Sequence, residues 1–168
     1  MKKALLSVIS IIIVIVTLVP TAFAANEQLP EWQDLVLTEE EFNAILANNT
    51  VHTIDEETRA TGLISAYAMA ISKSGTNTLN ISGLTTGTAD VVKSGFKEVV
   101  IQRRASSSSS WTDYVTYEDI YIDQFAYVLG KSLTVPTGYQ YRVTCIHYAK
   151  KNFFSVQKID NVSNIIQF

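Results

Sequence analysis

Apolar and polar side chains alternate over much of residues 61–168, and this period of two is the feature that most restricts the fold. In a β-strand such alternation places the apolar residues on one face and the polar residues on the other. The alternating segments are short, and turn-forming stretches such as 73–76, 106–110 and 136–138 separate them. About seven or eight such strands in roughly 109 residues predict two packed antiparallel sheets, with a small closed barrel as the alternative.

The pattern also predicts where the strands and the core lie. Strands are expected within residues 63–71, 79–81, 96–104, 114–122, 125–135, 139–149, 153–159 and 164–168, and residues 83–95 are expected to be a Thr- and Gly-rich connection. Tyr141, or alternatively Tyr139, follows a Pro-Thr-Gly turn early in its strand, as in the tyrosine corner of immunoglobulin-like sandwiches. We therefore predict an all-β, immunoglobulin- or fibronectin type III-like antiparallel sandwich. Its predicted core includes Leu79, Ile81, Val99, Ile101, Tyr141, Val143 and Cys145.

Cys145 is the only cysteine, so no disulfide within the chain can hold this fold. His147 lies two residues further along the same predicted strand, and both side chains therefore share a face. A nucleophilic thiol needs a helix N-terminus, a cation or a paired histidine to lower its pKa, and a mid-strand position is atypical for such a site. Zinc needs three or four ligands, but the only other histidine is the distant His52. We predict a buried thiol beside a half-buried histidine, with no catalytic residues, metal or cofactor.

The first 24 residues have the three parts of a secretory signal peptide. Lys2 and Lys3 precede an uncharged apolar run, which ends at Pro20, and Ala22 and Ala24 form a cleavage signal. We expect cleavage near Ala25, secretion of the mature chain, and no membrane span after the signal is removed.

Residues 25–60 form a separate acidic segment in this prediction, ahead of the sandwich at 61–168. Residues 25–59 carry nine acidic residues and one basic residue, whereas residues 60–168 carry seven acidic and ten basic residues. Thr38 and Glu41 form a helix-capping pattern, and Phe42, Ile45 and Leu46 would share one helical face. The segment is expected to be partly helical or disordered. The weak positive charge of residues 60–168 does not predict nucleic-acid binding.

Two surfaces are candidates for ligand binding. The stretch TDYVTYEDIYIDQF would place aromatic rings beside carboxylates on one strand face, an arrangement that can stack a sugar ring and bond its hydroxyl groups. The candidate residues are Trp111, Tyr114, Tyr117, Asp119, Tyr121 and Asp123, and the alternative interpretation is an ordinary solvent-exposed face with β-prone tyrosines. The basic residues Arg103, Arg104, Lys150 and Lys151 would protect a sheet edge or bind anions such as teichoic acids weakly.

Three blocks of sequence resemble a family of small exported proteins of low-GC Gram-positive bacteria, many of them from the gut. The blocks are GFKEVVIQRRASSSSSW, GYQYRVTCIHYAKK and SVQKIDNVSNI, and the resemblance covers about residues 60–168. It implies a secreted β-sandwich and no particular activity. The positions that match the family pattern are Ile101, Gln102, Arg103, Trp111, Tyr141, Arg142, Val143, Thr144, His147, Tyr148, Ala149, Lys150 and Lys151.

The sequence favours a secreted, non-enzymatic binding module whose expected partner is a cell-surface glycan or a protein. A second hypothesis is a bacteriocin- or toxin-like effector that is released when an acidic prosegment is cleaved near Arg59. A third is a small hydrolase with paired carboxylates, but nothing in the sequence places two carboxylates at the required separation.

Overall fold

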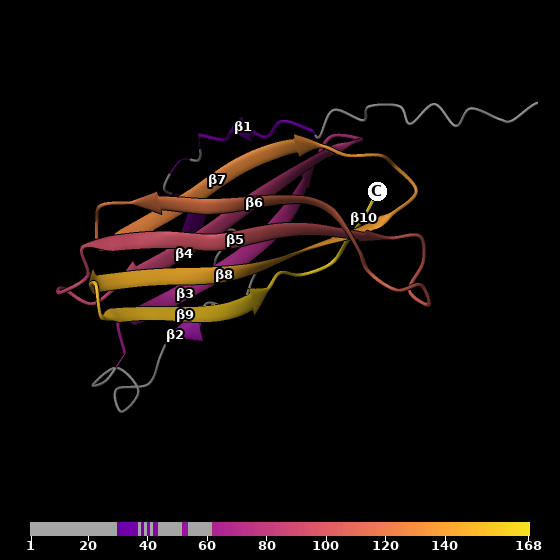
Figure 1. Cartoon of the computed structure of the whole chain (residues 1–168). Coiled ribbons are helices and arrows are strands. Elements are labelled where there is room, and N and C mark those ends of the chain that lie inside the picture. The colour runs from indigo at the N-terminus through magenta and orange to yellow at the C-terminus, as the bar shows by residue number, and fades with distance from the viewer. Residues whose placement is uncertain (1–29, 37, 39, 41, 44–51, 54–61) are drawn as a thin grey trace, which may run out of the picture.

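The computed structural model describes residues 30–36, 38, 40, 42–43, 52–53 and 62–168, and it confirms an all-β sandwich (Figure 1). The signal peptide predicted at residues 1–24 lies outside the described residues. Two antiparallel sheets pack face to face, and their strands run along the length of the molecule. The strands are β1 (Gln33–Asp34), β2 (His52–Thr53), β3 (Ile64–Ser74), β4 (Thr78–Gly87), β5 (Lys93–Arg104), β6 (Thr112–Ile122), β7 (Ala126–Thr134), β8 (Gln140–Asn152), β9 (Ser155–Val162) and β10 (Ile166–Gln167).

The strand order is that of the predicted sandwich class. The first sheet has the order β1-β7-β4-β3-β2, and the second has β6-β5-β8, with β9 and β10 paired in succession along the other edge of β8. If the seven long strands β3 to β9 are lettered A, B, C, C′, E, F and G, the sheets become A-B-E and C′-C-F-G. The fourth strand pairs with C, as in a fibronectin type III domain, whereas in immunoglobulin constant domains it pairs with E.

The core lies between the sheets and is built by alternate residues of the long strands. Along β8, every second residue from Tyr141 to Ala149 is buried, while the residues between them are partly exposed on the outer face of the second sheet. All seven residues predicted for the core are buried in one cluster, which confirms that prediction: Leu79, Ile81, Val99, Ile101, Tyr141, Val143 and Cys145.

The predicted tyrosine corner is present at Tyr141. Its hydroxyl group donates a hydrogen bond of 2.7 Å to the carbonyl oxygen of Pro136, five residues upstream. Gly138 completes the intervening turn with a φ of 86°, a conformation that glycine adopts without steric strain. Burial raises the pKa of Tyr141 to about 12. The hydroxyl group therefore stays protonated and fixes the crossing between the sheets.

Amide side chains join the two sheets along the edge of β3, on either side of the residues that pair with β2. The side chain of Asn164 accepts from the amide of Ile71 at 2.9 Å and donates to the carbonyl oxygen of the same residue at 3.0 Å. Oε1 of Gln157 accepts from the amides of Leu63 and Ile64. These bonds satisfy edge groups that would otherwise be available for pairing with another chain.

The connection between β4 and β5 is shorter than predicted. Residues 83–95 were expected to be a loop, but β4 continues to Gly87 and β5 begins at Lys93. Gly83 and Gly95, which suggested a loop, instead lie at strand positions where a larger side chain would clash with a neighbouring residue. A Cβ atom on Gly83 would lie 2.7 Å from Cζ of Phe96, and one on Gly95, whose φ is 149°, would lie 2.0 Å from the carbonyl oxygen of Ile120.

Two short strands from the acidic segment predicted at residues 25–60 pair with the sandwich. β1 pairs with β7 through Asp34 and Lys131, and β2 pairs with β3. Trp32 packs against the core cluster. The predicted helix is represented by one turn, in which the amide of Phe42 bonds the carbonyl oxygen of Thr38 at 3.0 Å. Ile45 and Leu46 lie outside the described residues, and within the described part no helix is long and apolar enough to cross a bilayer.

Candidate functional site: an arginine–aromatic end of the sandwich

The pair Cys145 and His147 lies at the centre of the sandwich, not in a cleft. Cys145 is 3% exposed and His147 is 0% exposed, so the expectation of a half-buried histidine was wrong. The hydroxyl group of Thr85 donates its single proton to the carbonyl oxygen of Gly95 at 3.0 Å. It must therefore accept from Nδ1 of His147, which lies 2.8 Å away.

In the neutral imidazole, this assignment leaves Nε2 of His147 as an acceptor. Asn161 Nδ2 lies 3.3 Å and Cys145 Sγ lies 3.5 Å from this nitrogen. Burial, followed by the negative charge of Asp160, raises the pKa of Cys145 well above its ordinary value. The thiol is therefore a protonated packing group at neutral pH and not a nucleophile. No group of three or more potential metal ligands occurs among the described residues.

The six candidate ligand-binding residues do not form one surface, because the alternation of β6 is broken at Asp119. This residue has a φ of 56°, the only positive φ of a non-glycine residue in the described part of the chain. Tyr117 pairs with the core residue Val99 and so faces the interior, whereas Tyr121 pairs with Gly95 and lies on the outer face. Asp123 follows the end of β6 and forms an exposed ion pair of 3.0 Å with Lys93.

Tyr117 holds the N-terminal strand and is not available to a ligand. Its ring stacks on Trp32 with centroids 3.5 Å apart and an angle of 3° between the planes. Its hydroxyl group donates to the carbonyl oxygen of Pro30 at 2.7 Å. Burial raises the pKa of Tyr117. The ring therefore stabilises the attachment of β1 to the sandwich.

Tyr121 and Tyr148 meet above Gly95 on the outer face of the second sheet, with ring centroids 4.5 Å apart. The hydroxyl group of Tyr121 donates to Asp119 Oδ1 at 2.8 Å, and Lys97 forms an ion pair with the same oxygen. The hydrogen bond from Lys97, followed by that from Tyr121, lowers the pKa of the Asp119 carboxyl group. The polar groups beside these rings are therefore already paired within the protein.

Trp111 lies at the opposite end of the same outer face, between two arginines. The guanidinium carbon of Arg104 is 4.3 Å from the centre of the Trp111 ring, and that of Arg142 is 4.5 Å from it. Arg104 comes from the end of β5, and Arg142 comes from the start of β8. Arg103, which pairs with the core residue Tyr141, lies on the inner side of the same end of the sheet, with its guanidinium carbon 4.5 Å from the ring of Tyr114 and 4.8 Å from that of Tyr139. We call these six residues the arginine–aromatic end: Arg103, Arg104, Trp111, Tyr114, Tyr139 and Arg142.

Hydrogen bonds to neutral groups orient the two outer guanidinium groups. Nε of Arg104 donates to Gln140 at 2.8 Å, and Nη1 of the same arginine donates to the carbonyl oxygen of Ser107 at 3.1 Å. Nε of Arg142 donates to Gln102 at 2.8 Å. These bonds use neutral acceptors and leave both positive charges uncompensated. The two guanidinium groups are therefore held in place by their contacts with the Trp111 ring and by these hydrogen bonds.

No arginine of this end forms an ion pair within the described part of the chain, since the four ion pairs found there all belong to lysines. The nearby carboxylate of Asp113 accepts from Gln102. An oriented guanidinium group without a carboxylate partner matches the geometry of carboxylate, phosphate and sulfate groups. This arrangement can bind an anion from outside the protein.

Sequence reasoning identified only part of this site. It grouped Arg103 and Arg104 with Lys150 and Lys151, but the register of β5 and β8 places Lys150 opposite Lys93, at the other end of the sheet from Arg104. The sequence singles out Arg142 only as part of the family pattern. Its position between the apolar residues Tyr141 and Val143 could have indicated that the Arg142 side chain lies on the outer face of the sheet.

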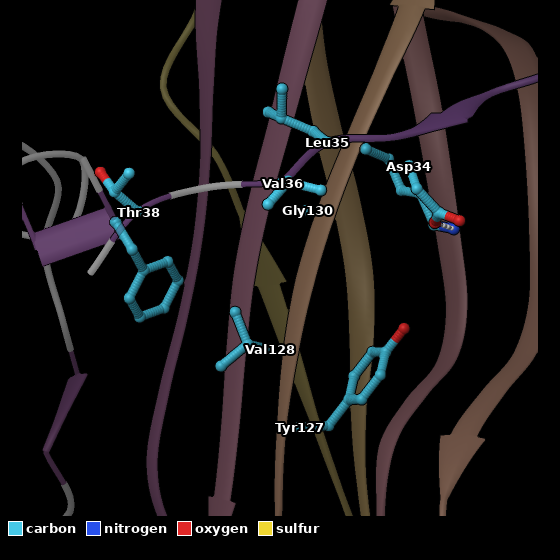
Figure 2. Close-up of a pocket in the computed structure, with 9 residues that line it drawn as sticks. Asp34, Leu35, Val36, Thr38, Tyr127, Val128 and Gly130 are labelled. Carbon is cyan, nitrogen blue, oxygen red and sulfur yellow. Dashed lines mark hydrogen bonds and ion pairs between the residues drawn. The ribbon is translucent and has the colours of Figure 1, made fainter. Parts of the chain in front are cut away.

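A groove of about 510 Å³ lies beside the edge of β7 (Figure 2). The segment from Asp34 to Val36 runs past the side chains of Tyr127 and Val128, and an ion pair between Asp34 and Lys131 closes one side. Its walls are a mixture of apolar and polar groups without an unpaired charge that would select a ligand. Its lining residues are Asp34, Leu35, Val36, Thr38, Phe42, Tyr127, Val128, Gly130 and Lys131.

No family model matches the sequence, and no curated protein matches it significantly.

Proposed function

We propose that this protein is an extracellular, non-enzymatic binding module and that its arginine–aromatic end binds the anionic groups of a surface polymer. The observation that carries the proposal is the placement of Arg104 and Arg142 against Trp111 without a carboxylate partner among the described residues. The extracellular setting rests on the signal-peptide pattern and on the resemblance to small exported bacterial proteins.

The chemistry of this end favours an acidic glycan or a phosphate-bearing wall polymer. Guanidinium groups bind carboxylate and phosphate oxygens through two parallel hydrogen bonds. The indole ring of Trp111 can contact the apolar face of a sugar ring. A polymer that repeats an anionic group along a chain can engage Arg104 and Arg142 together, because both lie on the outer face at the same end of the second sheet.

Titration calorimetry with polygalacturonate fragments, poly(glycerol phosphate) and a neutral glucan tests the proposal. We expect both anionic polymers to bind, with an affinity that falls as salt rises because exposed charges are screened within about 8 Å at physiological ionic strength. The double variant Arg104→Gln/Arg142→Gln should lose at least about tenfold in affinity, since two charge-assisted contacts disappear. Equal binding of the neutral glucan, or no loss in the double variant, would refute the proposal.

Two single variants sharpen the experiment. Arg142→Lys keeps the charge but removes the planar fork and its bond to Gln102, so it should bind clearly less tightly than wild type. Lys158→Gln removes a charge from the exposed face of β9 in the same sheet, away from Trp111, and should bind normally. If Arg142→Lys binds like wild type while Lys158→Gln loses affinity, net charge governs the binding, and the fork geometry has no role.

A further inference from the structure

The β8–β9 hairpin carries two phenylalanines at its tip, and the fold does not use them. Asn152 pairs with Ser155, so Phe153 and Phe154 are the two connecting residues. Their side chains are 82% and 93% exposed. Their rings contact each other edge to face, with centroids 5.1 Å apart, and neither residue belongs to a core cluster of the described chain. We call this pair the apolar tip.

The turn itself does not require phenylalanine. Many two-residue hairpin connections need a positive φ and therefore favour Asn-Gly or Asp-Gly, but neither Phe153 nor Phe154 has a positive φ in this turn. Here the side chain of Asn152 caps the turn by accepting from the amide of Phe154 at 3.0 Å. Small polar residues would serve this geometry equally well. Exposing two large apolar rings side by side is unfavourable in water, which indicates an apolar environment at some stage of function.

Other exposed apolar side chains lie at the same end of the molecule. The β4–β5, β6–β7 and β8–β9 connections are together at one end of the sandwich (Figure 1). Val92 of the first connection and Phe125 of the second are each 55% exposed. Backbone hydrogen bonds hold these loops in place, because the amide of Val92 donates to Lys150 and the carbonyl oxygen of Phe125 accepts from Gly87. The apolar end is therefore a fixed feature.

Lysines surround the base of the apolar tip. Lys150 and Lys151 directly precede the turn, and Lys93 pairs across the sheet with Lys150. Asp90 lies 2.7 Å from Lys151, and Asp123 lies 3.0 Å from Lys93, in exposed ion pairs that contribute little to stability. Lys150 forms no ion pair within the described chain. The end thus has apolar rings at its apex and a small excess of positive charge behind them.

We propose that this end of the sandwich docks onto a phospholipid bilayer that contains anionic lipids, with the apolar tip inserted at the boundary between headgroups and acyl chains. A projecting apex suits a fluid layer, whereas protein interfaces are larger and packed against a shaped partner. Apolar rings ahead of lysines match the order of acyl chains and anionic headgroups in such a bilayer. Two rings bury less apolar surface than a single lipid chain, which itself gives only reversible binding, so the attachment is reversible and depends on the lysines as well.

Vesicle sedimentation of the protein recovered from the medium of a secreting host tests this proposal. We expect binding to vesicles of phosphatidylcholine with about 30% phosphatidylglycerol and weaker binding to phosphatidylcholine alone, because the lysines favour anionic lipid. Phe153→Asn/Phe154→Gly places two turn-forming residues that also accept the negative φ of this connection, and it should fold normally. It should bind these vesicles at least about tenfold less, since two buried rings are lost. Ile165→Ser, which alters an exposed apolar residue outside this end, should bind like wild type.

A second measurement reports on insertion itself. Brominated acyl chains should quench the fluorescence of the tryptophan introduced by Phe154→Trp. They should not quench the fluorescence of the native Trp32 and Trp111, which lie elsewhere in the fold. Unchanged vesicle binding of the Phe153→Asn/Phe154→Gly variant, or absence of quenching in Phe154→Trp, would overturn the proposal. The proposal would also be overturned if wild type does not bind vesicles but dimerises with rising concentration, and if Phe153→Asn/Phe154→Gly abolishes this dimerisation. That result would assign the tip to a second copy of the chain.

Discussion

Replacement of His147 by alanine should destabilise the sandwich strongly. The side chain is fully buried between Phe96, Tyr67 and the polar group of Thr85. Truncating a large buried side chain to alanine typically costs about 2–5 kcal/mol, with the upper values for sites that cannot collapse. The lost hydrogen bond to Thr85 adds about 1 kcal/mol, and removal of the buried ring nitrogens returns part of this. We therefore expect a loss of about 3 kcal/mol.

Urea unfolding at pH 7 measures this loss, with two substitutions of Cys145 as comparisons. Cys145→Ala removes only the sulfur atom and should cost about 1 kcal/mol. Cys145→Ser should be tolerated similarly, because Nε2 of His147 is an acceptor for the new hydroxyl group. In wild type, a thiol reagent should label Cys145 only on unfolding. A cost below about 1 kcal/mol for His147→Ala, together with rapid native labelling that this variant abolishes, would refute the structural role.

Two further predictions concern the N-terminal strand and alkaline pH. Trp32→Ala should lower the free energy of unfolding by about 1–3 kcal/mol in a urea titration, because the stack on Tyr117 is lost, and an unchanged midpoint would show that β1 contributes nothing. The raised pKa of Tyr141 means that the native state holds this proton more tightly than the unfolded state. The stability that this proton contributes is complete below pH 10, the ordinary tyrosine value, and is lost as pH rises towards 12. Tyr141→Phe should flatten this part of the plot of unfolding free energy against pH. An equal slope in both proteins would contradict the assignment.

The sandwich and its core could be predicted from sequence because both depend on local alternation. Tyr141, Val143 and Cys145 occupy every second position of one strand, and the turn before them contains Pro136 and Gly138, so strand, face and corner follow from neighbouring residues. The strand β1 could not be predicted in this way. It has two residues, and it is a strand only because the edge of β7 lies beside it and Tyr117 binds the adjacent Trp32.

The candidate site shows a second limit of local pattern. A period of two through β6 predicts Tyr117 and Tyr121 on the same face of the sheet. Asp119, which lies between them, takes a left-handed conformation that aspartate tolerates better than most residues, and the two tyrosines therefore face opposite sides. The meeting of Trp111 with Arg142 depends on the register of β8 against β5 and of β5 against β6. This register depends on the packing of the whole sheet and cannot be predicted from the sequence of any single strand.

The arginine–aromatic end and the apolar tip lie at opposite ends of the second sheet, which makes their independence testable. β5 spans this distance with 12 residues, from Lys93 to Arg104. At about 3.3 Å per residue the two ends are about 40 Å apart, several times the screening length of about 8 Å at physiological salt. Charges at one end therefore have little direct effect at the other.

Substitutions at the two ends should then act additively, because distant sites without shared partners rarely couple. Arg104→Gln/Arg142→Gln should weaken polymer binding and leave vesicle binding unchanged, while Phe153→Asn/Phe154→Gly should do the opposite. The combined variant should show both losses at their separate magnitudes in calorimetry and sedimentation. If either pair of substitutions changes both activities by a similar factor, a single surface or a global change in folding explains the binding. An additive result would support a rigid sandwich that holds an anionic polymer at one end and a bilayer at the other.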